Sequence, residues 1–476
     1  MFIEANKTTA AANPATAKSA SGYVLRISLT AALAGFIFGF DTVVISGANL
    51  PIKELWHTSP WFHGFFIMSM ALWGTVIGAI FGGLPTQKWG RKKVLVWIGI
   101  LFSLSAVGTA FAPEPYSFSL FRFIGGLGIG VSSVAAPTYI SEISTPANRG
   151  KLVALYQFNI VFGILVAFLS NYFLKGVGGA NDWRYMLGAL AIPSIIYSAM
   201  VVGVPESPRW LITQKKNTSL AKTILAKLGI VNVEEEVATI IKSYQHETAA
   251  GDGLLSPPAS NHNLLDKKYR TIMWLAFMVA FFNQWSGINF ILYYAPEILQ
   301  RAGLAAKESL FNSIAIGGTN LVFTFVGLYL IDRVGRKTLL IIGSIGYIVS
   351  LVAVAWCFAS HAAPGVLMTF LLLFIAAHAI GQGAVIWVFI SEIFPNNVRA
   401  IGQSFGASVH WVFAALITLI TPVFLDDKFG IFKDNPWPIF AFFAFMMVLQ
   451  LVWVLTKVPE TKGVSLENLE KQLVKP

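Results

Sequence analysis

The sequence predicts an all-α polytopic membrane protein with twelve transmembrane helices in two related halves of six. This prediction depends on the composition, on the length of the apolar segments and on short motifs that occur twice in the same order. Of the 476 residues, 55% are apolar and only 12% are charged, whereas roughly a quarter of the residues in a soluble globular domain are charged. We therefore expect most of the chain to lie in lipid.

The apolar segments are long enough to cross a bilayer, which takes about 20 mostly apolar residues in helical form. Half of the candidates precede residue 205 and half follow residue 269. The first set covers 23–48, 61–82, 94–112, 117–141, 152–174 and 184–204, and the second covers 270–298, 309–331, 338–360, 365–393, 401–424 and 436–456.

Short motifs recur from one half to the other in the same order. The clearest is a glycine-rich basic run between two apolar segments. The echoes, in chain order, are 82–93 with 327–338, 141–149 with 391–399, and 205–207 with 459–461. Three echoes in one order indicate tandem duplication of a six-helix unit.

Five regions follow from this division. They are a cytoplasmic N-terminal tail at 1–22, a six-helix bundle at 23–204, a cytoplasmic helical linker at 205–269, a second six-helix bundle at 270–457 and a cytoplasmic C-terminal tail at 458–476. The N-terminal tail shows no secretory signal, because it has no apolar run before Tyr23, and we expect it to be disordered.

The linker carries apolar side chains at helical spacing. One stripe includes Val233, Val237 and Ile240, and a shorter one surrounds Ile224. We expect short amphipathic helices here, with a flexible break at 251–260, where glycine, proline and serine accumulate.

Basic residues predict the orientation, because Lys and Arg near span ends are retained in the cytoplasm. Those of the short connections fall on one side of the predicted bundle: Arg91, Lys92, Lys93, Arg149, Lys151, Arg333, Arg336, Lys337 and Arg399. Both termini and the linker are then cytoplasmic. The net charge of +11 follows from this clustering, so we exclude a nucleic-acid role.

Two charged residues lie deep inside spans of the first half, Asp41 and Arg122. Each is costly there unless it is paired or lines water. At 1.5 Å per residue both lie about 10–12 Å below the outer ends of their spans, so they can meet. One interpretation is a structural ion pair. The one we favour is a proton switch, in which Arg122 holds Asp41 ionised and protonation of Asp41 frees the helices.

Amide side chains gather near the middle of the seventh span, at Asn283, Gln284 and Asn289. They either hydrogen-bond between helices, at about 1 kcal/mol per contact, or line a hydrated cavity that binds hydroxyl groups. Asn320 and His410 are expected near the same depth. A glycine-rich interruption at 381–383 predicts a weakened tenth span. It precedes two tryptophans that could cover the apolar face of a sugar ring, Trp387 and Trp411.

Charged residues at the cytoplasmic span ends repeat in both halves. Singly they are ordinary interfacial charges. Their repetition predicts a gate of ion pairs, a latch that forms when the cytoplasmic entrance is shut and breaks when it opens. The predicted gate set is Arg91, Glu142, Arg149, Glu206, Asp332, Arg336, Glu392, Arg399 and Glu460.

No catalytic or metal-binding constellation is apparent, so we predict that the protein is not an enzyme. We expect no metal site and no cofactor, with the proton as the coupling ion. The single cysteine, Cys357, excludes an internal disulfide. His378 and His410 lack carboxylate partners in the sequence pattern, and we interpret both as polar walls of a cavity.

These motifs resemble the sugar porter family of the major facilitator superfamily over residues 23–473. The superfamily's basic loop is similar to 82–93 and 327–337. The narrower sugar-porter signatures are similar to 122–126, 205–209 and 459–463. The resemblance implies the major facilitator fold, two pseudo-symmetric bundles with a cytoplasmic helical segment between them.

The resemblance also implies roles for individual residues. Asp41 and Arg122 match the proton-coupling pair of bacterial symporters, whereas facilitators lack that acid. The positions that match sugar contacts of the family are Gln157, Gln284, Asn289, Asn320 and Trp387.

The chain also departs from the family pattern. Gln87 replaces the usual acid of the first basic loop, although Asp332 keeps it in the second. Asn283 replaces a glutamine and His410 replaces an amide. The identity of the substrate therefore cannot be copied from a relative.

We therefore predict a proton-coupled symporter that imports a monosaccharide, a hexose or a pentose, by alternating access. We expect a monomer in a bacterial inner membrane, whose partners are the sugar, protons and the lipid bilayer. The first alternative is a facilitator without proton coupling, in which the Asp41 pair only braces the fold. A sugar sensor is disfavoured by the short tails, and a drug exporter by the hydroxyl-matching amides.

Overall fold

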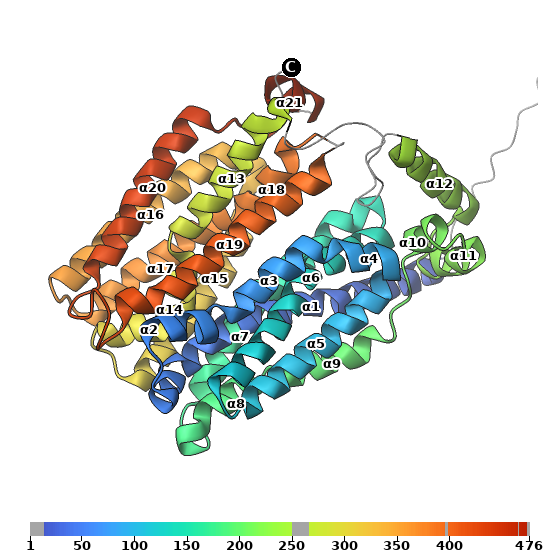
Figure 1. Cartoon of the computed structure of the whole chain (residues 1–476). Helices are drawn as coiled ribbons and strands as arrows, with labels where there is room; N and C mark the ends of the chain where they lie inside the picture. Colours follow the sequence, from blue (N-terminus) through green and yellow to red (C-terminus); the bar gives the residue numbers. More distant parts are fainter. Residues whose placement is uncertain (1–13, 250–265, 396–397, 465, 474–476) are drawn as a thin grey trace, which may run out of the picture.

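The computed structural model describes residues 14–249, 266–395, 398–464 and 466–473. The described regular structure is helical, and it forms two bundles that lie side by side (Figure 1). Among the described residues, eleven helices are long and apolar enough to span a membrane, and a further pair, bent by 44°, gives a twelfth when it is taken as one span. The predicted all-α fold with two halves of six spans is confirmed.

The first bundle begins with α1 and ends with α9. Its helices are α1 (Pro14–Trp56), α2 (Pro60–Phe62), the π-helix η1 (His63–Met68), α3 (Met70–Phe81), α4 (Gly83–Trp89), α5 (Arg91–Phe111), α6 (Pro115–Ile143), α7 (Pro146–Leu174), α8 (Asp182–Gly188) and α9 (Ala191–Val201).

The linker and the second bundle follow. The linker helices are α10 (Pro208–Thr213), α11 (Thr218–Lys227) and α12 (Val233–Ala249). The second bundle consists of α13 (Arg270–Trp285), α14 (Ile288–Arg301), α15 (Ala306–Val334), α16 (Arg336–Ala359), α17 (Pro364–Ile380), α18 (Gln382–Ile393), α19 (Arg399–Leu425) and α20 (Trp437–Lys457), and α21 (Leu466–Leu473) comes after it.

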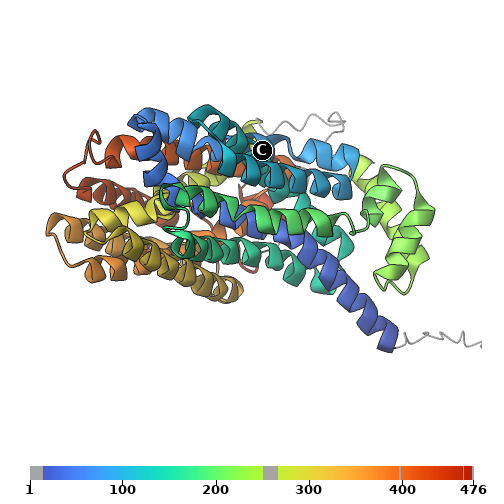
Figure 2. The same ribbon diagram turned by 90° about the horizontal axis from the view of Figure 1, so that it is seen from below.

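The two ends of the molecule differ in charge. We call the end at which α5 and α16 begin the basic end, because both basic loops lie there, and we call the other the opposite end. Figure 2 shows that the linker helices extend beyond the bundle at the end where α1 begins. They are held by apolar packing, because Trp210, Leu225 and Val237 are buried.

Residues 14–22 differ from the prediction. We expected the whole segment 1–22 to be a disordered tail, but α1 already begins at Pro14. This part contains several alanines, the residue with the strongest helix propensity, so the helix of the first span can extend toward the N-terminus. Residues 1–13 and the break that we predicted at 251–260 lie outside the described residues.

Several spans of the described structure are interrupted, and three of these breaks bear on the site. In the seventh, Gly287 adopts φ +88° between α13 and α14, a conformation that glycine adopts without steric cost. In the tenth, Gly381 separates α17 from α18, which confirms the predicted interruption. The second span bends between η1 and α3. Such breaks free backbone groups at membrane depth, which is tolerated only where protein or a cavity surrounds them.

Glycines let α3 and α6 approach closely. A Cβ atom built on Gly126 would lie 1.9 Å from the carbonyl oxygen of Ala71, and one on Gly130 would lie 2.3 Å from that of Thr75. Small residues at such crossings are typical of membrane helix pairs. The glycine run 125–130 is therefore a packing surface.

We predict that Gly126→Ala lowers stability by about 1–3 kcal/mol, because the new methyl group forces α3 and α6 apart. Thermal unfolding of the detergent-purified protein measures this. Gly318→Ala is the matched control, because a Cβ atom there meets nothing within 4 Å. Equal melting temperatures for the two variants would contradict the packing argument.

Candidate functional site

A chain of amide hydrogen bonds lies at the break between α13 and α14. Asn289 Nδ2 donates to Gln284 Oε1 at 2.8 Å, and Gln284 Nε2 donates to Asn283 Oδ1 at 2.9 Å. All three side chains are buried. Because α14 restarts after Gly287, both helices contribute side chains to one polar surface at membrane depth.

Aromatic rings continue this polar surface. The Nε2 atom of His410, on α19, lies 3.2 Å from the Nε2 atom of Gln284. The ring centroid of His410 is 5.0 Å from Trp387 of α18 and 4.8 Å from Trp411. Trp387 keeps 39% of its surface accessible although it packs against His410. Trp411 reaches Phe38 of α1, with ring centroids 5.5 Å apart, so this cluster touches both halves.

Two predicted residues are not hydrogen-bonded to this cluster in the described structure. Asn320 of α15 is buried and Gln157 of α7 is partly buried. Within the described residues neither side chain has a hydrogen-bond partner, so no hydrogen bond joins either of them to Gln284. Their helices do pack across the halves, as in the contact between Phe158 and Phe325, whose ring centroids are 5.6 Å apart. These amides therefore keep donors and acceptors available for a ligand.

Asp41 and Arg122 meet between α1 and α6. Arg122 Nη1 donates to Asp41 Oδ1, and the two residues are 3% and 2% exposed. Arg122 Nε and Nη2 are buried and find no partner in the described part of the chain. Such unpaired donors cost stability, so this ion pair is not optimised as a brace.

The first basic loop forms a compact charge cluster. Arg91 donates to Glu142 through Nη2 at 2.7 Å and through Nε at 2.9 Å. Glu206 Oε1 accepts from the backbone N–H groups of Arg91 at 2.9 Å and Lys92 at 3.0 Å. Ser207 Oγ donates to Glu142 at 2.6 Å. Three segments meet here, namely the start of α5, the end of α6 and the stretch that leads into α10.

The second basic loop repeats this geometry. Arg336 donates to Glu392 at 2.7 and 3.1 Å, and Glu460 accepts from the backbone N–H groups of Arg336 and Lys337. Asp332 adds a contact of 3.1 Å to Arg336. In the first half, Gln87 stands where such an acid would be, and its Oε1 atom finds no partner among the described residues. The two halves therefore repeat in contacts as well as in sequence.

Within the described residues, Arg149 and Arg399 of the predicted gate set bond to backbone carbonyl groups and not to the gate acids. Arg149 Nε donates to the carbonyl oxygen of Ser141 at 3.1 Å, and Arg399 Nε to that of Phe394 at 3.2 Å. Glu142 is already bound by Arg91, and Glu392 by Arg336. Each arginine donates to both oxygens of its carboxylate partner. Each cluster joins residues of one half only. That the clusters latch the two halves together stays a prediction.

The halves are joined by charge at the opposite end, which the sequence analysis did not predict. Lys53 Nζ of α1 lies 2.6 Å from Asp426 Oδ2 and 2.8 Å from Asp427 Oδ1, just after α19. The hydrogen bond from Lys53 lowers the pKa of the Asp427 carboxyl below its usual value. The sequence did contain a signal for this ion pair, because Lys53, Asp426 and Asp427 carry opposite charges and lie on the same predicted side of the membrane.

A buried hydrogen-bond chain lies beside this ion pair. Thr58 Oγ1 lies 2.8 Å from His63 Nδ1, and His63 Nε2 lies 2.7 Å from Asn49 Oδ1. Asn49 Nδ2 then donates to Glu297 Oε2 of α14 at 2.6 Å. The chain thus crosses from the first half to the second with its polar groups paired, as a buried network requires. At the opposite end the two halves are therefore joined by hydrogen bonds as well as by charge.

Two bundles around a central polar surface, joined by polar contacts at one end, define a membrane transporter. The sequence pattern of the family described as Sugar (and other) transporter matches residues 27–473, and the chain belongs to this family, the sugar porters of the major facilitator superfamily. It is a transporter and not an enzyme.

The relatives agree with this assignment. The arabinose-proton symporter of Bacillus subtilis is 34% identical over 468 residues, which are 97% of each chain. The D-xylose-proton symporter of Escherichia coli is 32% identical and covers 94% of this chain and 96% of its own. The inward open conformation of the xylose transporter XylE from E. coli superposes with a TM-score of 0.81 at 31% identity, over 95% of this chain and all of the other.

We predict that Lys53→Ala opens the opposite end more often, because it removes both carboxylate contacts between the halves. A contact worth about 1 kcal/mol corresponds to a roughly five-fold shift of the equilibrium. The measurement is the rate of thiol labelling of a cysteine introduced at the buried position Ala48, in a Cys357→Ser background.

The matched control is Lys428→Ala, because Lys428 lies at the same end with an exposed side chain. Labelling should accelerate several-fold for Lys53→Ala alone. Unchanged labelling would show that the ion pair does not hold this end closed.

Proposed function

We propose that the protein is a proton-coupled symporter that imports a monosaccharide by alternating access through a cell membrane. The observation that carries this proposal is the buried ion pair of Asp41 and Arg122. It joins two helices at membrane depth, where an ionisable pair is costly and marks ion pathways or proton relays. Relatives named as arabinose-proton and xylose-proton symporters support the proposal.

The substrate side of the proposal rests on the amide and aromatic surface. Amides offer a donor and an acceptor side by side, which matches neighbouring hydroxyl groups. Binding sites of this kind reject analogues that lack a hydroxyl, because buried polar groups are then left unpaired. Gln284, Asn289 and Asn320 supply the amides, and Trp387 and Trp411 supply flat apolar faces. A pentose or a hexose fits this chemistry.

The orientation follows from the placement of the basic loops. Because Lys and Arg of short loops stay in the cytoplasm, the basic end is the cytoplasmic one and both termini lie there. The opposite end then faces outside, and the contacts of Lys53 and Glu297 close the outer entrance. The structure corresponds on this proposal to an inward-facing state, which the similarity to the inward open transporter supports.

The transport cycle then involves two kinds of contact. Charge clusters within each half keep that half rigid, and contacts between the halves at the outer end are made and broken as the halves rock. Asp41 takes its proton from outside, which releases Arg122 and lets the loaded carrier turn inward. Each proton gains about 2.3 kcal/mol per 100 mV of membrane potential, enough for roughly 50-fold accumulation of sugar.

We predict that Asp41→Asn exchanges sugar but cannot accumulate it, because an amide cannot bind and release the coupling proton. The measurement compares counterflow with uptake driven by a pH gradient in proteoliposomes, over a panel of labelled pentoses and hexoses. Wild-type protein should show both activities, and the variant only counterflow.

Two outcomes contradict parts of this proposal. If wild type and variant both equilibrate sugar regardless of the gradient, the pair is structural and the protein is a facilitator. If neither protein moves any sugar of the panel, the substrate class is wrong.

We further predict that Asn320→Ala raises KM for the transported sugar about ten-fold or more, because one hydroxyl of the sugar loses its partner. Initial rates of uptake measure this. Asn312→Ala on the same helix is the control, because within the described residues its side chain bonds only to the backbone of Glu308. An equal KM for wild type and Asn320→Ala would remove Asn320 from the site.

A further inference from the structure

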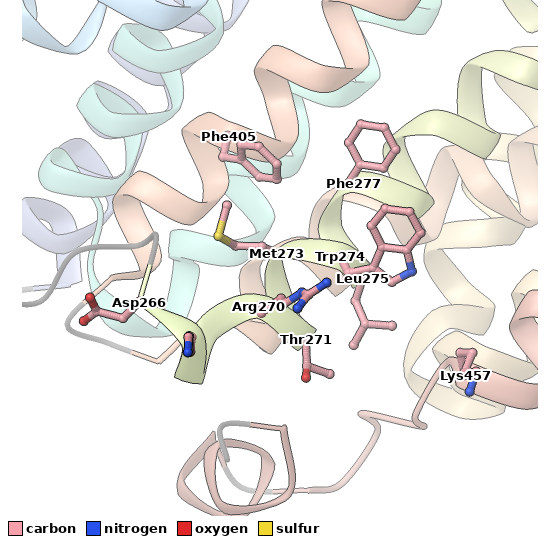
Figure 3. A pocket seen from close by; sticks show the side chains of 10 residues that line it. Asp266, Arg270, Thr271, Met273, Trp274, Leu275, Phe277, Phe405 and Lys457 are labelled. Atoms are coloured by element: carbon pink, nitrogen blue, oxygen red, sulfur yellow. The ribbon is translucent and has the colours of Figure 1, made fainter. Parts of the chain in front are cut away.

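A cavity of about 790 Å³ lies at the basic end of α13, between that helix and parts of α19 and α20. Figure 3 shows its lining, with Arg270 and Trp274 on α13, Phe405 from α19 and Lys457 from the end of α20. Gln284 lies on α13 at least seven residues beyond this lining, about 10 Å farther along the helix. The cavity is therefore separate from the proposed sugar site.

The charge of this cavity is not balanced. Lys267, Arg270 and Lys457 line it, and Asp266 is the only acid of the lining. In the part of the chain that the structure describes, none of the three basic side chains forms an ion pair or a hydrogen bond. By contrast, Arg91 and Arg336 at the same end are each bound by a carboxylate. This excess of positive charge favours an anionic ligand.

The lining changes from charged to aromatic along the helix axis. Arg270, Trp274 and Phe277 follow one another at helical spacing on one face of α13, over about 10 Å. The rings of Trp274 and Phe277 stack, with centroids 5.5 Å apart and planes at 11°. Trp274 is 56% exposed, so this aromatic surface is open to a ligand.

We propose that this cavity binds an anionic phospholipid of the leaflet at the basic end. The phosphate lies between Arg270 and Lys457, and the first part of an acyl chain lies against Trp274 and Phe277. Basic pockets between spans are known recognition sites for lipid headgroups. Basic residues at span ends alone also follow from membrane orientation, but they need neither a cavity nor a stacked aromatic floor beneath the charges.

The order of the charged and aromatic residues along α13 favours a lipid over a soluble anion. A soluble phosphate needs only the charged rim of the cavity, whereas a lipid also covers the aromatic surface. The aromatic side chains lie on the membrane side of the charges, because α13 runs from the basic end into the bundle (Figure 1). A phospholipid presents its headgroup and chain in the same order.

The experiment is a titration of the detergent-purified full chain with brominated phosphatidylglycerol, followed by quenching of tryptophan fluorescence. Brominated phosphatidylcholine and inorganic phosphate are the comparison probes. We expect saturable quenching by phosphatidylglycerol at concentrations where phosphatidylcholine has little effect, and no competition from millimolar inorganic phosphate. The double variant Arg270→Gln/Lys457→Gln should bind roughly 30-fold more weakly.

Two further variants distinguish lipid binding at this cavity from a general effect of positive surface charge. Lys88→Gln/Lys151→Gln removes two exposed basic residues of the first half and should leave the affinity unchanged. Trp274→Phe should remove the saturable quenching while phosphatidylglycerol still raises the melting temperature, which shows that the lipid binds at α13.

Three results would overturn the proposal. They are equal quenching by the two lipids, an unchanged affinity of the Arg270→Gln/Lys457→Gln protein, and full displacement of the lipid by inorganic phosphate, which would indicate a site for a soluble anion.

Discussion

The cost of placing charged and polar groups in lipid is the constraint on which this structure depends. It forces the backbone into helices, and it requires a partner for nearly every polar side chain inside the bundle. Asp41 and Arg122 satisfy it only with each other, and two donors of the guanidinium remain unpaired in the described structure. A pair built in this way contributes little to stability. This supports our proposal that the role of the pair depends on breaking it.

The duplicated charge clusters and the contacts between the halves have different roles. Arg91 with Glu142, and Arg336 with Glu392, are bound bidentately inside their own halves, so these clusters hold the helices of each half together at its basic end. Contacts of the opposite end, such as that of Lys53 with Asp426, cross between the halves and must break when that end opens. Rigid bundles with breakable contacts between them are what rocking about a central site requires.

The features that could be predicted from the sequence are those that follow from the cost of placing charge in lipid, from the length of apolar segments and from motifs that occur in both halves. The number of spans and the meeting of Asp41 with Arg122 follow from apolar length and from charge inside the membrane, and the break at Gly381 follows from glycine spacing. The partner of Arg149, the carbonyl oxygen of Ser141, was not predicted, because a position near a span end does not say which group a side chain reaches. Glu297 was missed because a single acid near a span end looks interfacial. Only the packing of α1 against α14 brings Asn49 to it.

The central claim is that sugar and protons move together. The most direct measurement adds a transported sugar to de-energised proteoliposomes in weakly buffered medium and records the external pH. The account predicts that the medium becomes alkaline as sugar enters, in proportion to the sugar taken up. Sugar entry without any change in external pH would contradict it and would leave the buried ion pair with a structural role.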